Sequence, residues 1–137
     1  MCGIAGILGP WRDGAAALAK MTGAIAHRGP HGQGLWSDPY CALGHRRLAI
    51  IDLSEAGRQP MRVPEASVTI SYNGEVYNFR ELREDLESKG QRFQSGTDTE
   101  VILRLYLEYG DAFTHLLEGM YALAIWDPAR MQLLLAR

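Results

Sequence analysis

The first nine residues, MCGIAGILG, constrain the fold most, because the chain is apolar and glycine-rich from its second residue. Chain ends are usually frayed and polar, whereas this pattern predicts a buried strand. A small residue after the initiator Met allows that Met to be removed, which would leave Cys2 as the N-terminal residue. Its α-amino group, with an ordinary pKa near ~8, could then accept the proton of its own thiol. The alternative is that Cys2 is a small buried hydrophobe, as most free cysteines are.

The composition is that of one globular domain without a strong charge. The chain has 137 residues, of which 47% are hydrophobic and 22% charged, and its formal net charge is −2. This balance offers no electrostatic basis for binding nucleic acid or an anionic membrane. The chain has two cysteines, no apolar segment of membrane-spanning length and no positively charged region before its short apolar start. Together these features predict a cytoplasmic protein.

Hydrophobic periodicity and turn residues predict helices and strands along the whole chain. In the first helix, Leu18, Met21 and Ile25 would form the face toward the core. Because several strands are joined by hairpins and the helices are grouped between them, the pattern indicates an α+β fold. After an N-terminal strand, we expect helices over residues 15–26, 79–89, 97–109 and 111–117, and strands over residues 35–37, 41–48, 68–72, 92–94, 120–126 and 132–137.

Glycines and capping residues mark the expected ends of these elements. Residues 27–34 hold three glycines and a proline, which predicts a shaped loop. Asn73-Gly74 after a strand is typical of a tight hairpin turn, and that structural role alone would explain both residues. Gly90 would cap the second long helix, and Thr97 with Glu100 forms a capping box at the start of the third.

Five residues match the needs of an amino-acid substrate that carries a side-chain amide. The Arg47 guanidinium could bind the α-carboxylate through two hydrogen bonds, and Asp98, in the first turn of a helix, could bind the α-ammonium. The Asn73 amide and the Gly74 N–H could supply two donors to a tetrahedral oxyanion, beside the Cys2 thiol. Spacing alone does not show that these groups converge.

Metal and nucleotide sites find little support in the sequence. His27 and His31 would share one face of a helix, but Gly29 and Pro30 lie between them and disfavour a helix. The chain has no Cys-x-x-Cys pair, which zinc sites commonly use. The glycines of residues 29–34 match neither the dinucleotide nor the Walker spacing. We therefore expect no metal and no cofactor in this domain.

Six motifs spread over the whole chain are those of a known family. They are MCGIAG at residues 1–6, HRGP at 27–30, GHRRLAIID at 44–52, YNGEVYN at 72–78, SGTDTEV at 95–101 and LEGMYA at 117–122. In these motifs the sequence resembles the class II glutamine amidotransferases, above all the glutamine-hydrolysing asparagine synthetases and their relatives in surface-polysaccharide biosynthesis. It departs from the family pattern at His31, where an acidic residue is common.

The resemblance implies a fold, a reaction and a role for each candidate residue. The fold would be the αββα sandwich of N-terminal-nucleophile hydrolases, with two mainly antiparallel sheets between helix layers. Cys2 would form a γ-glutamyl thioester and release ammonia from L-glutamine, and Asn73 and Gly74 would form the oxyanion hole. The residues that bind the substrate would be Arg47, Leu48, Ile50, Ile51, Asn73, Gly74, Glu75 and Asp98.

The resemblance also implies partners beyond these residues. A glutaminase (glutamine amidotransferase type 2) domain over residues 1–137 would end within a continuing β-hairpin and lack its C-terminal part. A synthetase domain that uses ATP and Mg²⁺, also absent, would receive the ammonia for asparagine biosynthesis. The oligomeric state is left open. Two alternatives remain: the glutaminase domain of a sugar-phosphate or phosphoribosyl amidotransferase, or a non-catalytic glutamine-binding or assembly module.

Overall fold

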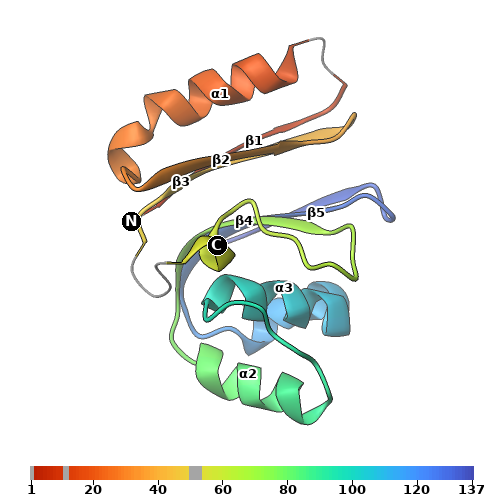
Figure 1. The fold of residues 1–137 in the computed structure, drawn as a ribbon. Coiled ribbons are helices and arrows are strands. Elements are labelled where there is room, and N and C mark those ends of the chain that lie inside the picture. Colours follow the sequence, from red (N-terminus) through yellow and green to blue (C-terminus); the bar gives the residue numbers. More distant parts are fainter. Residues whose placement is uncertain (1, 11–12, 50–53) are drawn as a thin grey trace.

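Two antiparallel sheets lie face to face between two layers of helices in the computed structural model, which describes residues 2–10, 13–49 and 54–137 (Figure 1). The first sheet consists of β1 (Gly3–Leu8), β3 (Cys41–Arg47) and β2 (Gly32–Ser37), in that spatial order. Helix α1 (Gly14–Ala24) covers its outer face. A short 3-10 helix, η1 (Ala26–Arg28), leads from α1 toward β2.

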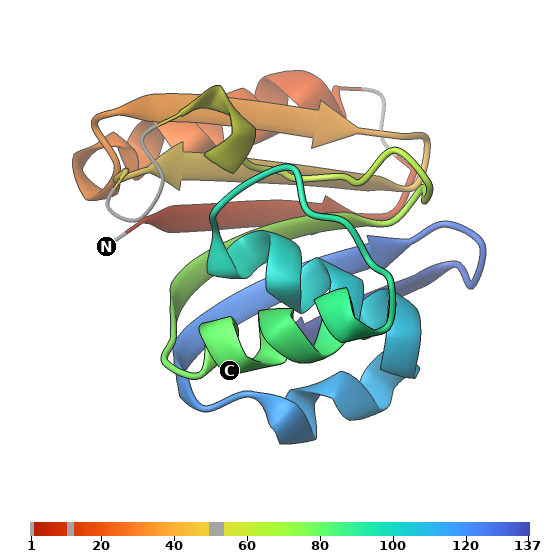
Figure 2. The same cartoon turned by 60° about the horizontal axis from the view of Figure 1, so that its bottom comes forward.

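The second sheet has the order β4 (Thr69–Val76), β5 (Gly119–Asp127) and β6 (Gln132–Ala136). Helix α3 (Asp98–Tyr109) packs on its outer face, and α2 (Phe79–Ser88) lies against α3 (Figure 2). These layers confirm the αββα sandwich expected above. Two further 3-10 helices, η2 (Glu55–Gly57) and η3 (Gly110–Leu116), occupy connections. No helix in the described part of the chain is long and apolar enough to cross a membrane.

The larger hydrophobic core lies between the second sheet and α3. The helix is buried from Asp98 to Tyr106, because β4, α2 and η3 surround it. The ring of Tyr106 meets that of Phe113 edge to face, with 5.9 Å between their centroids. A smaller apolar cluster fills the space between the two sheets and consists of Cys41, Leu43, Ala124 and Trp126, with Trp36 and Leu133 packed against it.

Elements bounded by local hydrogen bonds lie where the sequence predicts them. Thr97 is the N-cap of α3, and its Oγ1 accepts a 3.2 Å hydrogen bond from the N–H of Glu100. Gly90 follows α2 with a φ of +87°, the left-handed conformation that favours glycine at this position. The hairpin of β5 and β6 also agrees with the prediction.

The predicted break at Asn73-Gly74 is wrong, because β4 continues through both residues to Val76. Asn73 pairs with Ala122 and Gly74 with Tyr121 of β5. A Cβ atom at Gly74 would lie 2.5 Å from the carbonyl oxygen of Met120. This glycine therefore permits a close approach of two strands and does not form a turn.

The predicted loop over residues 27–34 is only partly correct, because β2 already begins at Gly32. A Cβ atom at Gly34 would collide with the carbonyl oxygen of Gln59, so here too glycine permits a close approach within a strand.

The predicted core face of α1 is wrong at Met21, which is 40% exposed. Thr22 is fully buried instead, and its hydroxyl is satisfied there because it donates to the carbonyl oxygen of Leu18 within the helix.

The predicted strand over residues 92–94 is also wrong, because these residues belong to no sheet in the described part of the chain. The backbone N–H groups of Gln94 and Ser95 both donate to the buried carboxylate of Glu100. The N–H of Thr97 donates to Ser95 Oγ at 3.4 Å, so Glu100 does not complete the capping box with Thr97. Its carboxylate orders the loop that leads into α3.

Candidate active site

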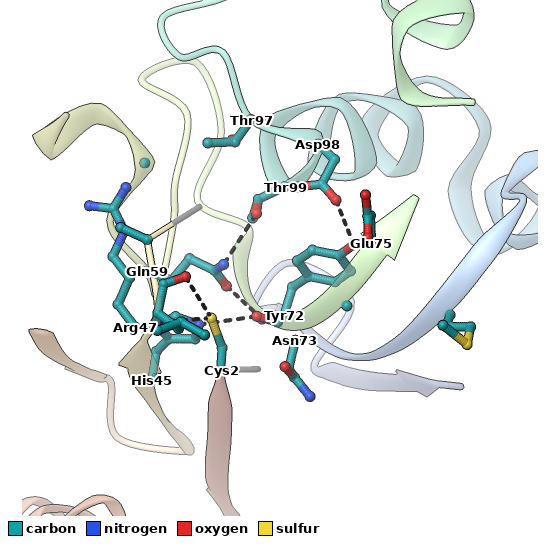
Figure 3. Close-up of a pocket in the computed structure, with 15 residues that line it drawn as sticks. Cys2, His45, Arg47, Gln59, Tyr72, Asn73, Glu75, Thr97, Asp98 and Thr99 are labelled. Atoms are coloured by element: carbon teal, nitrogen blue, oxygen red, sulfur yellow. Dashed lines mark hydrogen bonds between the residues drawn. The ribbon is translucent and has the colours of Figure 1, made fainter. Parts of the chain in front are cut away.

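A pocket opens where the start of β1, the end of β3, the edge of β4 and the first turn of α3 meet (Figure 3). Its volume is about 190 Å³, below the roughly 300–1,000 Å³ of sites for drug-sized ligands, so it suits a small molecule. The pocket is lined by Cys2, His45, Arg47, Leu48, Ala49, Gly57, Gln59, Tyr72, Asn73, Gly74, Glu75, Thr97, Asp98, Thr99 and Met120.

The half-buried Cys2 side chain lies against the peptide groups of Leu48. The N–H of Leu48 donates to the Cys2 sulfur at 3.3 Å, and the thiol is 3.6 Å from the carbonyl oxygen of Leu48. Arg28 Nε donates to the backbone carbonyl oxygen of Cys2 at 3.0 Å. Residue 2 is thus held just before β1, with a backbone donor beside its sulfur that would stabilise a thiolate.

Arg47 ends β3 and lies on the same side of the pocket. Strand residues alternate between faces, so Arg47 and His45 share the inner face of the first sheet with the buried Leu43. One Arg47 Nη1–H donates to the carbonyl oxygen of Ser54 at 2.8 Å, which anchors the half-buried side chain. The expected binding residues Ile50 and Ile51 lie outside the described residues.

The edge of β4 borders the pocket with Asn73, Gly74 and Glu75. The N–H of Tyr72 donates to Gln59 Oε1, and the N–H of Val76 donates to Asp98 Oδ2, so both point away from β5. Because backbone groups alternate along an antiparallel strand, the N–H of Gly74 points to this same open edge. The Asn73 side chain is on the opposite face from that of Tyr72 and is directed toward the first sheet.

Asp98 is buried at the start of α3, where its Oδ2 accepts hydrogen bonds from the Tyr72 hydroxyl at 2.6 Å and from the Val76 N–H at 3.2 Å. Burial raises the pKa of Asp98, and these hydrogen bonds oppose that rise. Glu75, the other expected partner of an ammonium group, is exposed at the rim of the pocket.

Three pocket residues, His45, Gln59 and Tyr72, received no role from the sequence. Gln59 Oε1 accepts from the Tyr72 N–H at 2.6 Å, and its Nε2 donates to Thr99 Oγ1 at 3.1 Å. His45 Nε2 lies 3.1 Å from the carbonyl oxygen of Tyr72 and must carry a proton to bond there. Desolvation by burial lowers the pKa of His45 to about 4, so the imidazole is neutral at physiological pH. The signal available in the sequence is a polar histidine on the same strand face as the apolar Cys41 and Leu43.

The structure thus brings Cys2, Arg47, Asn73, Gly74 and Asp98 to one pocket, although they come from both sheets and from a helix. Within the described residues, no group of three or more His, Cys, Asp or Glu side chains could hold a metal ion. The chemistry available to a ligand here is a thiol, one guanidinium, two carboxylates and the donors along the β4 edge.

Comparison with known proteins shows what the whole chain is similar to. The family model described as the glutamine amidotransferase domain matches residues 1–137. A glutamine-hydrolyzing asparagine synthetase of Bacillus subtilis is 38% identical over 146 residues, which cover 100% of this chain and 23% of that protein. One from Sandersonia aurantiaca is also 38% identical, over 100% of this chain and 26% of its own length. The chain therefore spans about a quarter of these relatives.

Solved structures show the same fold at lower sequence identity. The glutamine phosphoribosylpyrophosphate amidotransferase of B. subtilis superposes with a TM-score of 0.77 at 23% identity, over 91% of this chain and 35% of that one. This likeness confirms the αββα fold described above. Because the family model matches the full length, the chain belongs to the glutamine amidotransferase domain family.

Proposed function

We propose that this domain hydrolyses L-glutamine to glutamate and ammonia, with Cys2 as the nucleophile after Met1 has been removed. The observation that carries the proposal is the convergence of the Cys2 thiol, Arg47, Asp98 and the open edge of β4 on one small pocket. Arg47 would bind the α-carboxylate through two hydrogen bonds. Asp98 and Glu75 would bind the α-ammonium.

The reaction would begin when the α-amino group of Cys2 takes the thiol proton and the sulfur attacks the side-chain amide carbon. The Gly74 N–H and the Asn73 amide would stabilise the oxyanion of the tetrahedral intermediate. Collapse of that intermediate would pass the proton to the departing nitrogen and release ammonia, leaving a γ-glutamyl thioester on Cys2. Water would then hydrolyse the thioester to glutamate and restore the thiol.

The fate of the ammonia extends the proposal beyond this chain. Its relatives are named glutamine-hydrolyzing asparagine synthetases and are about four times longer. We expect a further domain that uses ATP and Mg²⁺ to add the ammonia to a carboxylate in asparagine biosynthesis.

The cytoplasm is the expected compartment, because the sequence holds only two cysteines and no apolar segment of membrane-spanning length. The likeness to the phosphoribosylpyrophosphate enzyme is at the level of fold and does not favour the alternative acceptor.

The direct test is release of ammonia from L-glutamine by the wild type and by Cys2→Ala. We expect the substitution to abolish release and to prevent a thioester adduct, detected by mass spectrometry after an acid quench. Cys41→Ala is the matched control, because Cys41 is fully buried between the sheets and burial raises the pKa of its thiol to about 12. Activity in Cys2→Ala, or equal loss in both variants, would refute the proposal.

A further inference from the structure

The proposed reaction draws its parts from two separate sheets. Cys2 precedes β1, and Arg47 ends β3, both in the first sheet. Asn73 and Gly74 belong to β4, in the second sheet. The position of the nucleophile relative to the oxyanion donors therefore depends on how the two sheets are aligned.

Apolar packing alone aligns two sheets poorly, because the hydrophobic effect has no directional preference. The cluster between these sheets is formed by Cys41, Leu43, Ala124 and Trp126. Hydrogen bonds, in contrast, require a defined distance and angle. Hydrogen bonds across this interface would therefore fix the relative position of the two sheets, which apolar packing alone leaves poorly defined.

Two such hydrogen bonds join β3 to β4 beside the pocket. The Ser71 hydroxyl donates to the carbonyl oxygen of Gly44 at 3.1 Å, and His45 Nε2 bonds to the carbonyl oxygen of Tyr72 at 3.1 Å. Ser71 and His45 are 0% and 1% exposed, so both bonds are shielded from bulk water. The two contacts involve consecutive residues on each strand and therefore fix both position and direction.

Both hydrogen bonds lie close to the proposed reacting groups. The Tyr72 carbonyl belongs to the same planar peptide group as the Asn73 nitrogen, so His45 holds the peptide that leads into the oxyanion hole. On the other side, β3 pairs with β1, where Gly3 is opposite Arg46. The strand that carries His45 thus also places the residue that follows Cys2.

We infer that His45 and Ser71 are positioning residues that align the sheet bearing the nucleophile with the sheet bearing the oxyanion donors. The inference rests on the proposed glutaminase function and adds to it two residues that the proposed chemical steps do not use. Loss of either contact would shift Asn73 and Gly74 relative to Cys2. A misplacement of about 1 Å can reduce turnover by ~100-fold.

Thr69 offers a matched control on the same strand. It lies two residues before Ser71, so its side chain is directed to the same face, and it is fully buried. Its hydroxyl has no hydrogen-bond partner among the described residues. Thr69→Val therefore removes a buried hydroxyl from the same interface without breaking a bond between the sheets.

The test compares the steady-state glutaminase kinetics of His45→Leu, Ser71→Ala and Thr69→Val in the complete protein. We expect kcat to fall by roughly 10–100-fold in His45→Leu and several-fold in Ser71→Ala, with KM for glutamine within about twofold of the wild type. Thr69→Val should keep wild-type kinetics. His45→Gln, whose amide can still donate to the Tyr72 carbonyl, should recover most of the turnover.

Alkylation of Cys2 by iodoacetamide separates positioning from a general loss of structure. This reaction forms no tetrahedral oxyanion, so its rate should remain that of the wild type in every variant that folds. Wild-type kcat in both His45→Leu and Ser71→Ala, with Cys2→Ala inactive, would overturn the inference and leave the proposed function intact. An equal loss in Thr69→Val would also overturn it, and activity in Cys2→Ala would refute the proposed function itself.

Discussion

The Tyr72 hydroxyl donates a 2.6 Å hydrogen bond to the buried carboxylate of Asp98, which joins β4 to the first turn of α3. The residue before the proposed oxyanion hole therefore also orients the carboxylate proposed to bind the substrate ammonium. The two ends of a bound glutamine, its α-carbon groups and its side-chain amide, would be positioned by the same short segment of strand.

Tyr72→Phe should raise KM for glutamine several-fold, because Asp98 would lose one of the hydrogen bonds that orient it. The free energy of unfolding should fall by about 1–2 kcal/mol, the usual effect of losing a buried hydrogen bond. Tyr106→Phe is the control, since the Tyr106 hydroxyl bonds to Asp127 at 3.0 Å outside the pocket. The control should lose similar stability in urea unfolding while KM stays unchanged; an equal rise of KM in both variants would contradict the role of Tyr72.

Arg47→Lys should weaken glutamine binding by roughly tenfold or more with little change in kcat. A lysine ammonium cannot form the two parallel hydrogen bonds that a guanidinium forms with a carboxylate. Arg46→Lys is a suitable control, because Arg46 is the neighbouring arginine but does not line the pocket. Its Nε donates to the Thr22 carbonyl oxygen of α1 instead. If steady-state kinetics show that Arg47→Lys changes kcat alone, Arg47 does not bind the α-carboxylate.

Asn73→Ala should have the opposite kinetic signature, a loss of kcat of about 10²–10³ with a smaller change in KM. The expected loss is that of one donor to an oxyanion, a species present only after attack on the amide. The pre-steady-state rate of ammonia release gives the most direct reading. A change confined to KM would assign Asn73 to ground-state binding instead.

Local interactions made much of the fold predictable. Thr97 and Gly90 mark helix ends through contacts within a few residues, so the sequence alone predicts both correctly. The local chemistry of Asn73-Gly74 favours a turn, but pairing with the distant strand β5 keeps both residues in β4. The strand expected over residues 92–94 is absent for a similar reason, since the N–H of Gln94 donates to the Glu100 carboxylate on α3 and not to a strand.

The residues of the candidate site also differ in whether the sequence alone can reveal them. Cys2, Arg47 and Asp98 could be selected because each has a side chain whose chemistry matches one part of an amino-acid amide. His45 and Gln59 could not, because their significance depends on bonds to the Tyr72 backbone from other segments. Only the packed structure shows which strand edge these side chains reach.

Removal of Met1 should be required for activity, because a blocked amine cannot accept the Cys2 thiol proton. Across preparations with different degrees of processing, glutaminase activity should scale with the fraction that lacks Met1 in the intact mass spectrum. A preparation that retains Met1 on every molecule and still hydrolyses glutamine at the full rate would exclude the amine as the base.

The final prediction concerns the pH dependence of stability, which His45 should influence strongly. Burial lowers its pKa to about 4 in the folded state, against an ordinary 6.5. Between these values the unfolded chain binds a proton that the folded protein does not, so the free energy of unfolding should fall as pH falls from 6.5 toward 4. The contribution of His45 to this fall is about 3 kcal/mol. Burial also raises the pKa of Asp98, and this shift makes the free energy of unfolding rise as pH falls. The effect of Asp98 should be equal in wild type and His45→Gln, so the difference between the two proteins reports His45. Urea unfolding between pH 4.5 and 7.5 should therefore show a clearly flatter dependence in His45→Gln, and parallel curves for the two proteins would show that His45 is not a buried neutral imidazole.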